Sequence, residues 1–223
     1  MGNDVEELIT SALSAAAASL VAPGDWLTGD QRRAAAIQVL DARTNELDEQ
    51  RRQAISPNAV VGGHTATGEL SAEAVEVVHR VASDPGRLTR SWAEQLIAVL
   101  GEEAYTELVG VAACAMVLDT FSWALQDNEA SFGSSIQGMP ANERPEDVGD
   151  VGAWVSQSTG SGMANVSRSL SLVPVTNSAW VGLVQAMYSR GPGFLDLEWD
   201  RALSRPQVEL VAARTTAELE CFY

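Results

Sequence analysis

Hydrophobic residues recur every three to four positions through most of this chain, the spacing that places them on one face of an α-helix. The first such stripe runs from Val5 to Leu20, behind an Asp4-x-x-Glu7 pattern that can cap a helix start. A second predicted helix extends from Thr28 to Ile55, and one of its faces is expected to be mostly exposed to solvent. Because no alternating strand pattern of useful length accompanies these stripes, the sequence predicts an all-α fold.

The most apolar segment runs from Glu102 to Leu125, where hydrophobic residues occupy nearly every side of the predicted helix. That distribution is typical of a helix buried among other helices. Two shorter helices are predicted before it, one starting after Ser71 and one covering residues 92–100. We therefore expect the 102–125 segment to be the centre of the first half of the fold.

The composition changes between residues 128 and 167, where Gly, Ser, Asp and two prolines interrupt any sustained period. We interpret this stretch as a linker between two helical units. The first unit covers residues 1–127 and the second covers residues 168–223.

Two helices are predicted in the second unit. Asn177 is the expected cap of one of them. Ser204, three residues before Gln207, opens a capping box for the other, which is expected to continue to Tyr223.

The formal net charge is −16 with histidine neutral, from 30 acidic against 14 basic residues, and no cluster of basic residues interrupts it. Such a surface repels nucleic acid and anionic lipid, so neither is an expected partner. The first residues are acidic where a secretory signal is basic, and no run of about 18 apolar residues indicates a membrane span. We therefore expect a cytoplasmic protein.

Two segments of the chain match each other at a fixed offset. Glu107-Leu108-Val109 and Glu209-Leu210-Val211 are 102 positions apart, and each stands near the start of the most buried-looking helix of its half. We interpret this match as an internal duplication. The alternative is a chance match in a helical chain rich in Ala and Val.

The second copy also resembles a known family. Residues 205–214, Arg-Pro-Gln-Val-Glu-Leu-Val-Ala-Ala-Arg, and then Glu-Cys-Phe-Tyr at 220–223 resemble the helix that leads into Cys-x-x-Cys in AhpD-like proteins, the alkylhydroperoxidase and carboxymuconolactone decarboxylase family. In that family a glutamate stands twelve positions before the first motif cysteine, as Glu209 stands before Cys221. Three segments of the first half resemble the family's two-repeat members: 77–80, 84–89 and 105–109.

The resemblance implies an all-α protein of two repeats that reduces hydroperoxides, with Glu209 and Cys221 as catalytic residues. It also implies a homo-oligomer that receives electrons from a small redox protein or a dithiol cofactor. In the first repeat Asp119 stands where Cys221 stands in the second, so we expect that repeat to be structural. We expect no bound cofactor and no metal site, because the two histidines, His64 and His79, are separated in sequence.

The family's redox motif is incomplete in this chain, because its second residue would be position 224 and its histidine would follow later still. A peroxidatic thiol needs a second thiol to resolve its sulfenic acid, so we expect the chain as given to be weak or inactive. One hypothesis is that a UGA codon after Tyr223 encodes selenocysteine; an ordinary truncation and a genuine end are the alternatives. Twelve helical residues rise about 18 Å, so Glu209 and Cys221 need a helix break, a bridging residue or a neighbouring subunit to meet.

Two other functions are consistent with the sequence. The same fold hosts decarboxylases of lactone acids that do not rely on the cysteine pair, and a non-catalytic scaffold or binding module is the second alternative. Cys221 can equally be an ordinary buried cysteine, and Glu209 a solvated acid favoured by the helix dipole. Cys114, in an apolar run, is predicted to be a core residue. His79 is interpreted as a packing residue on an apolar helical face, and His64 as an isolated residue in a Gly/Thr loop.

Overall fold

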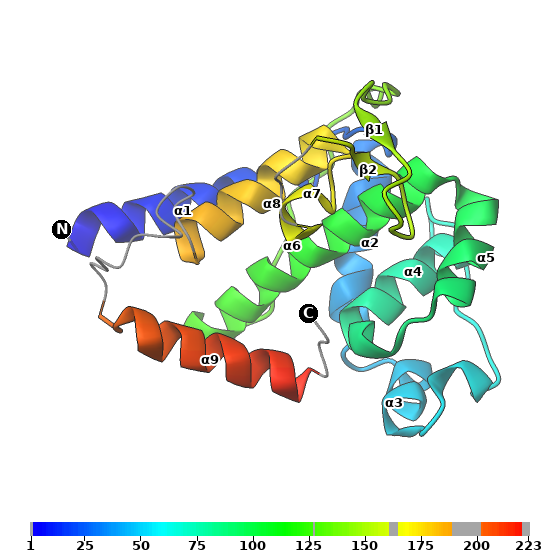
Figure 1. Ribbon diagram of the computed structural model, residues 1–223, viewed down its shortest axis with the longest axis horizontal. Helices are drawn as coiled ribbons and strands as arrows, with labels where there is room; N and C mark the ends of the chain where they lie inside the picture. The colour runs from blue at the N-terminus through cyan, green and yellow to red at the C-terminus, as the bar shows by residue number, and fades with distance from the viewer. Residues whose placement is uncertain (1, 127, 161–164, 189–201, 220–223) are drawn as a thin grey trace.

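The structure is a computed structural model that describes residues 2–126, 128–160, 165–188 and 202–219. Within these residues the predicted all-α fold is confirmed, because helices dominate and the only strands form a small hairpin (Figure 1). The helices are α1 (Gly2–Ser19), α2 (Gly29–Asp41), α3 (Glu46–Gln53), α4 (Ala72–Ser83), α5 (Arg90–Leu100), α6 (Glu102–Gln126), α7 (Asn165–Arg168), α8 (Pro174–Met187) and α9 (Arg205–Glu218), with 3-10 turns η1 (Pro57–Ala59) and η2 (Pro85–Arg87).

The long helix α6 lies across the middle of the molecule, as the sequence predicts (Figure 1). It packs against α2, α4 and α5, and also against α1 and α8. By length and composition alone α6 could cross a membrane. However, it carries the buried acids Glu107 and Asp119 and lies among other helices, so the molecule has the character of a soluble helical protein whose core helix is α6. The buried hydrophobic side chains of α6 are those of Tyr105, Leu108, Val111, Ala112, Cys114, Ala115 and Leu118.

The single helix predicted from Thr28 to Ile55 is wrong, because the chain divides there into α2 and α3. Asn45 causes the division. Its side-chain oxygen accepts the backbone N–H groups of Leu47 and Asp48 at 3.0 and 3.4 Å, which satisfies the free donors of a new helix start. The resulting turn buries Asp48.

The cap predicted for the helix after the linker is also wrong. α8 begins at Pro174, so Asn177 lies inside its first turn rather than before it. Proline fits this position because the first helical N–H groups have no intrahelical partner. The N–H groups of Val175 and Thr176 instead donate to the Asp25 carboxylate at 2.9 and 3.1 Å, so a residue far away in sequence caps the helix.

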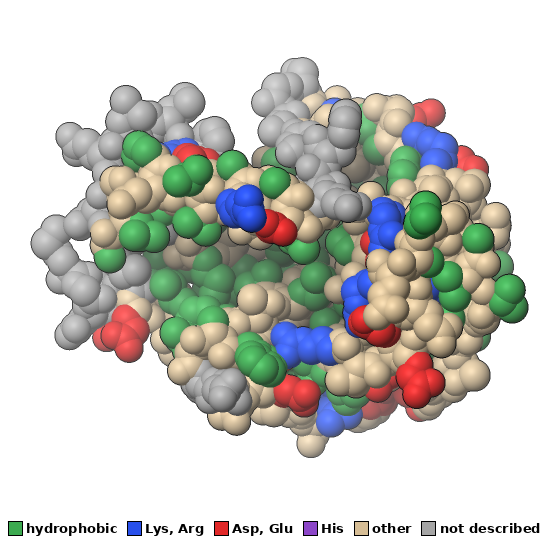
Figure 2. All heavy atoms as spheres, turned by 90° about the horizontal axis from the view of Figure 1, so that it is seen from below, with side chains coloured by type: hydrophobic (Ala, Val, Ile, Leu, Met, Phe, Trp, Pro, Cys, Tyr) green, Lys and Arg blue, Asp and Glu red, His purple; other side chains and the backbone are tan. Residues whose placement is uncertain are grey.

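The capping box predicted at Ser204 and Gln207 is confirmed at the start of α9. This helix buries no side chain, and it lies apart from the main bundle (Figure 1). On the side of the molecule where α9 lies, hydrophobic side chains gather around a hollow (Figure 2). The described part of α9 ends at Glu218, and the predicted continuation to Tyr223 falls on residues outside the described ranges.

The segment predicted to be a linker contains the hairpin of β1 (Val148–Gly149) and β2 (Gln157–Ser158), in which Val148 pairs with Ser158. Part of the segment also lies along the loop between α1 and α2. Ile136 donates its backbone N–H to Val21, and Ala141 to Gly24, at 2.7 and 3.0 Å. These bonds hold this part of the 128–167 segment against the α1–α2 loop.

Candidate functional site

Glu209, the base implied by the resemblance, lies in the first two turns of α9 with 44% of its side chain exposed. Its carboxylate accepts one hydrogen bond from Arg205 Nε at 2.9 Å and one from the Tyr188 hydroxyl at 3.0 Å. Partial burial and then the Glu209 carboxylate raise the pKa of Tyr188. Glu209 is therefore accessible to solvent and oriented by two donors. Cys221 lies outside the described residues.

Glu107 stands 102 positions before Glu209 but has a different environment, because it is completely buried. Its carboxylate accepts the backbone N–H groups of Asp25, Trp26 and Leu27 at 3.2, 2.5 and 3.0 Å. It also forms an ion pair with Arg32. Each carboxylate oxygen therefore has two donors, which leaves Glu107 no free position for a substrate.

Arg32 extends the network around Glu107 to two more helices. Its guanidinium donates to the backbone oxygen and the hydroxyl of Ser19 at 3.1 and 3.0 Å, and to the Thr176 hydroxyl at 2.7 Å. Asp25 in turn accepts the Thr176 hydroxyl at 3.1 Å. The network joins α1, α2, α6 and α8, and its saturated hydrogen bonding indicates a structural role.

The first half has no reactive thiol among its described residues. Asp119, at the position that matches Cys221, is buried, forms an ion pair with Arg43 and accepts the Ala130 N–H at 3.2 Å. Cys114 is 1% exposed, which confirms its predicted place in the core. Burial raises the pKa of its thiol to about 12, so it stays protonated at neutral pH.

The two histidines lie close together, so the interpretation of His64 as an isolated loop residue is wrong. The ring centroids of His64 and His79 are 4.0 Å apart. Both rings approach one carboxylate oxygen, Asp48 Oδ2, which lies 2.5 Å from His79 Nδ1 and 3.4 Å from His64 Nε2. We call Asp48, His64, His79 and the adjacent Glu76 the histidine cluster.

Opposite charges dominate the electrostatics of the histidine cluster. Burial opposes the charged form of His64, but the Asp48 and Glu76 carboxylates outweigh it and raise its pKa to about 9. Burial likewise opposes ionisation of Glu76, but His64 and Arg51 lower its pKa to about 2. Arg51 Nη1 donates to both Glu76 oxygens at 2.9 and 3.0 Å, and Arg51 Nη2 donates to the Gly62 carbonyl at 3.2 Å. Arg51 thereby holds the loop that carries His64.

Three segments contribute the histidine cluster, which explains why the sequence did not predict it. Asp48 comes from α3, Glu76 and His79 come from α4, and His64 comes from the loop between η1 and α4. One signal was present, because Glu76 and His79 are three positions apart and share a helical face. The missing information was the break at Asn45, which turns Asp48 toward that face.

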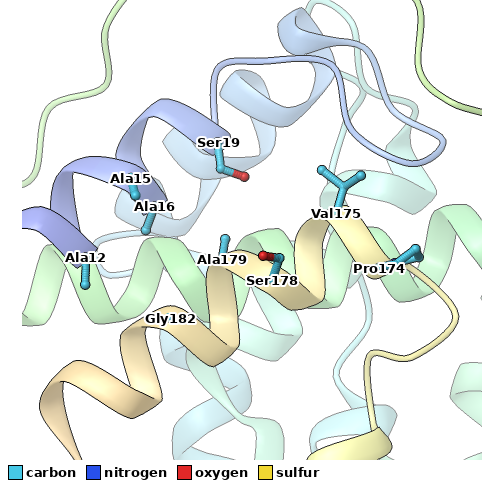
Figure 3. A pocket seen from close by; sticks show the side chains of 9 residues that line it. All are labelled: Ala12, Ala15, Ala16, Ser19, Pro174, Val175, Ser178, Ala179 and Gly182. Atoms are coloured by element: carbon cyan, nitrogen blue, oxygen red, sulfur yellow. The ribbon is translucent and has the colours of Figure 1, made fainter.

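A shallow groove of about 570 Å³ runs along α1 and α8, which pack against each other. Small side chains of the two helices line it, with Ser19 and Ser178 as its polar members (Figure 3). No charged side chain lines the groove, so it offers no acid or base for catalysis. The full lining consists of Ala12, Ala15, Ala16, Ser19, Pro174, Val175, Ser178, Ala179 and Gly182.

Comparison with known proteins gave a negative result. No family model, curated protein or solved structure matches this chain. One structural observation bears on the predicted internal duplication, because α4 and α8 begin at Ala72 and Pro174, again 102 positions apart.

Two places among the described residues are therefore suited to chemistry, and different segments of the chain form them. Around Glu209, an accessible carboxylate can exchange a proton with solvent or with a neighbouring group. In the histidine cluster, two imidazoles and a carboxylate converge below the surface. Acid–base chemistry suits the first place, and cation or proton binding suits the second.

Proposed function

We propose that this chain is an AhpD-like, thiol-dependent hydroperoxide reductase, in which Cys221 is the attacking thiol and Glu209 is its base. The contrast between the two matching halves carries the proposal. Glu107 is locked in the core and Asp119 replaces the thiol, whereas Glu209 is accessible and precedes a cysteine by twelve positions. Cys114, the other cysteine of this sequence, is buried with a raised pKa and cannot compete.

The proposed reaction begins when the thiol proton of Cys221 passes to Glu209 through a bridging residue or across a subunit contact, because α9 is unbroken from Arg205 to Glu218. The thiolate sulfur then bonds to one peroxide oxygen while the O–O bond breaks, and the leaving alkoxide takes the proton back to become an alcohol. Cys221 is left as a sulfenic acid. The hydroperoxide has been reduced by two electrons, and the sulfur oxidised by two.

A dithiol donor completes the cycle. The sulfur of its first thiol attacks the sulfenic sulfur and forms a mixed disulfide with Cys221, while the leaving hydroxide takes the thiol proton and departs as water. Its second thiolate breaks that bond, which restores the Cys221 thiol and leaves the donor as a disulfide. A small redox protein or a dithiol cofactor supplies this chemistry, and the cytoplasm, where such donors stay reduced, is the proposed location.

We also propose that the protein is a homo-oligomer. The apolar side chains of Leu210 and Val211 on α9 are 71% and 58% exposed, and those of Trp123 and Leu125 near the end of α6 are 51% and 66% exposed. Exposed apolar side chains are typical of a surface that another subunit covers, and hydrophobic side chains gather on the face of the molecule seen in Figure 2.

The test is the consumption of one equivalent of hydroperoxide by the fully reduced protein. We expect Cys221→Ser to abolish it and Cys114→Ala to leave it intact. Glu209→Gln should slow it by roughly 100-fold, because loss of a general base typically costs that much. The matched control is Glu218→Gln, which removes another exposed α9 carboxylate that pairs with an arginine four residues away.

Each contrary result favours one of the alternatives. Catalysis on a lactone acid that survives Cys221→Ser would support a decarboxylase-type enzyme. A Cys221 thiol that ignores both hydroperoxide and alkylating reagents in the folded protein would support a scaffold or binding module. Equal rates for Glu209→Gln and Glu218→Gln would remove Glu209 from the proposed site.

A further inference from the structure

The three donor side chains of the histidine cluster converge on one point. His64, His79 and Asp48 each offer one ligand atom, and these atoms all lie within 4.8 Å of one another. In a tetrahedral site with metal–ligand distances near 2.1 Å, neighbouring ligand atoms lie about 3.4 Å apart. Asp48 Oδ2 lies 2.5 Å from His79 Nδ1 and 3.4 Å from His64 Nε2, so small side-chain rotations would suffice.

One of these ligand atoms, on His64, lacks a hydrogen-bond partner among the described residues. The His64 side chain is only 4% exposed, and its Nε2 is buried without a hydrogen-bond partner among the described residues. Asp48 Oδ2 at 3.4 Å does not satisfy it. A buried polar atom without a partner is costly, and a metal ion that displaces the Nε2 proton would satisfy this nitrogen.

Each ligand side chain also makes a hydrogen bond with its other polar atom, and this second bond fixes its orientation. His79 Nε2 bonds Gln38 Oε1 at 2.9 Å, and His64 Nδ1 bonds Glu76 Oε2 at 2.7 Å. Asp48 Oδ1 accepts a hydrogen bond from a neighbouring hydroxyl at 3.3 Å, which leaves Oδ2 for the shared centre. Metal-binding histidines characteristically have a second partner of this kind, a carboxylate or an oxygen acceptor that fixes the ring.

The loop between η1 and α4 carries His64, and most residues of that loop are exposed, whereas Asp48 and His79 come from the helices α3 and α4. Displacement of this loop is therefore the route by which an ion would enter. Arg51, through Glu76 and the Gly62 carbonyl, would hold the loop in its closed position.

We propose that Asp48, His64 and His79 form a binding site for a divalent first-row transition metal ion of the zinc type. Two imidazole nitrogens and one carboxylate oxygen, with no thiolate, match the ligand preference of such ions. Three protein ligands leave a fourth position for water. The site is independent of Cys221 and of the proposed peroxidase chemistry.

The experiment is a calorimetric titration of chelator-treated, full-length protein with Zn²⁺, together with Co²⁺ absorption spectra. We expect one saturable equivalent of Zn²⁺ and visible ligand-field bands of four-coordinate Co²⁺. His64→Gln should weaken Zn²⁺ binding at least tenfold and remove the Co²⁺ bands. Cys221→Ser should bind both ions like the wild type, which separates this test from that of the peroxidase.

Glu49→Gln is the control, because it removes an exposed carboxylate of α3 outside the cluster and should leave binding unchanged. Absence of a stoichiometric site in the wild-type protein would overturn the proposal, as would unchanged Zn²⁺ affinity in His64→Gln. If that variant does not fold, the Co²⁺ spectrum of the wild type decides, and a spectrum identical to aqueous Co²⁺ would overturn the proposal.

Discussion

At the scale of single residues, the buried network around Glu107 depends on a glycine. A Cβ atom at Gly24 would lie 2.0 Å from Glu107 Oε1 and 2.2 Å from Arg32 Nη1. Glu107 Oε1 accepts hydrogen bonds from Asp25 N–H and Arg32, and Arg32 Nη1 also donates to Thr176, so neither atom can move aside cheaply. The absence of a side chain at Gly24 is what allows the α1–α2 loop to approach this ion pair.

We expect Gly24→Ala to lower the free energy of unfolding by about 3 kcal/mol, because it forces a methyl group into a saturated polar network. Urea unfolding followed by circular dichroism measures this. Gly63→Ala is the matched control, since nothing lies within 4 Å of its Cβ position, and it should change stability by less than about 0.5 kcal/mol. Equal effects of the two substitutions would contradict the close approach at Gly24.

Burial of Cys114 predicts a pH effect on stability. Its folded pKa is about 12, raised from 9.0, so the thiol contributes stability that is complete below pH 9 and is lost as pH rises from 9 toward 12. One pH unit above 9, the loss should be about 1 kcal/mol. We expect Cys114→Ala to show a smaller fall in urea midpoint between pH 8 and pH 10, and parallel curves would argue against a buried thiol.

Residue environments were predictable only where the local pattern determines them. Cys114 lies in an apolar run, and its burial follows from that run. Glu107 and Glu209 share the same three-residue motif, yet one is fully buried and the other is exposed. The difference arises from Arg32 and the α1–α2 loop, which pack against α6 from a distant part of the sequence.

At the scale of elements, helix starts with local caps were predictable and those with distant caps were not. Ser71, Ser204 and their capping patterns mark real helix starts. The start of α8 depends on Asp25, about 150 positions away, so no local pattern reveals it. The division between α2 and α3 was missed because the polar residues around Asn45 are compatible with a continuous helix as well as with a turn.

Asp25 predicts a measurable coupling between the α1–α2 loop and α8. Asp25→Asn replaces one acceptor oxygen with an amide donor that faces the N–H groups of Val175 and Thr176. We expect a loss of roughly 2 kcal/mol in stability, and faster amide hydrogen exchange in α8 than in α4. Glu146→Gln, an exposed acid, is the control. Unchanged exchange in α8 would show that Asp25 does not cap it.

At the scale of the whole molecule, one core centred on α6 joins most helices, while α9 remains exposed. Its apolar residues give the proposed subunit interface. We expect light scattering to report a mass at least twice that of the 23.6 kDa chain. Leu210→Glu together with Val211→Glu should shift the protein toward monomer, whereas Thr216→Glu, on the opposite side of α9, should not. A monomeric wild type would refute the interface.

The most direct test of the account is the state of the two cysteines after exposure of the reduced, folded protein to one equivalent of a hydroperoxide. Dimedone traps sulfenic acids, and peptide mass spectrometry locates the adduct. We predict an adduct on Cys221 and none on Cys114, because only the buried thiol is held protonated in the core. An unlabelled Cys221 in the folded protein, or label on Cys114 instead, would contradict the proposed thiol chemistry.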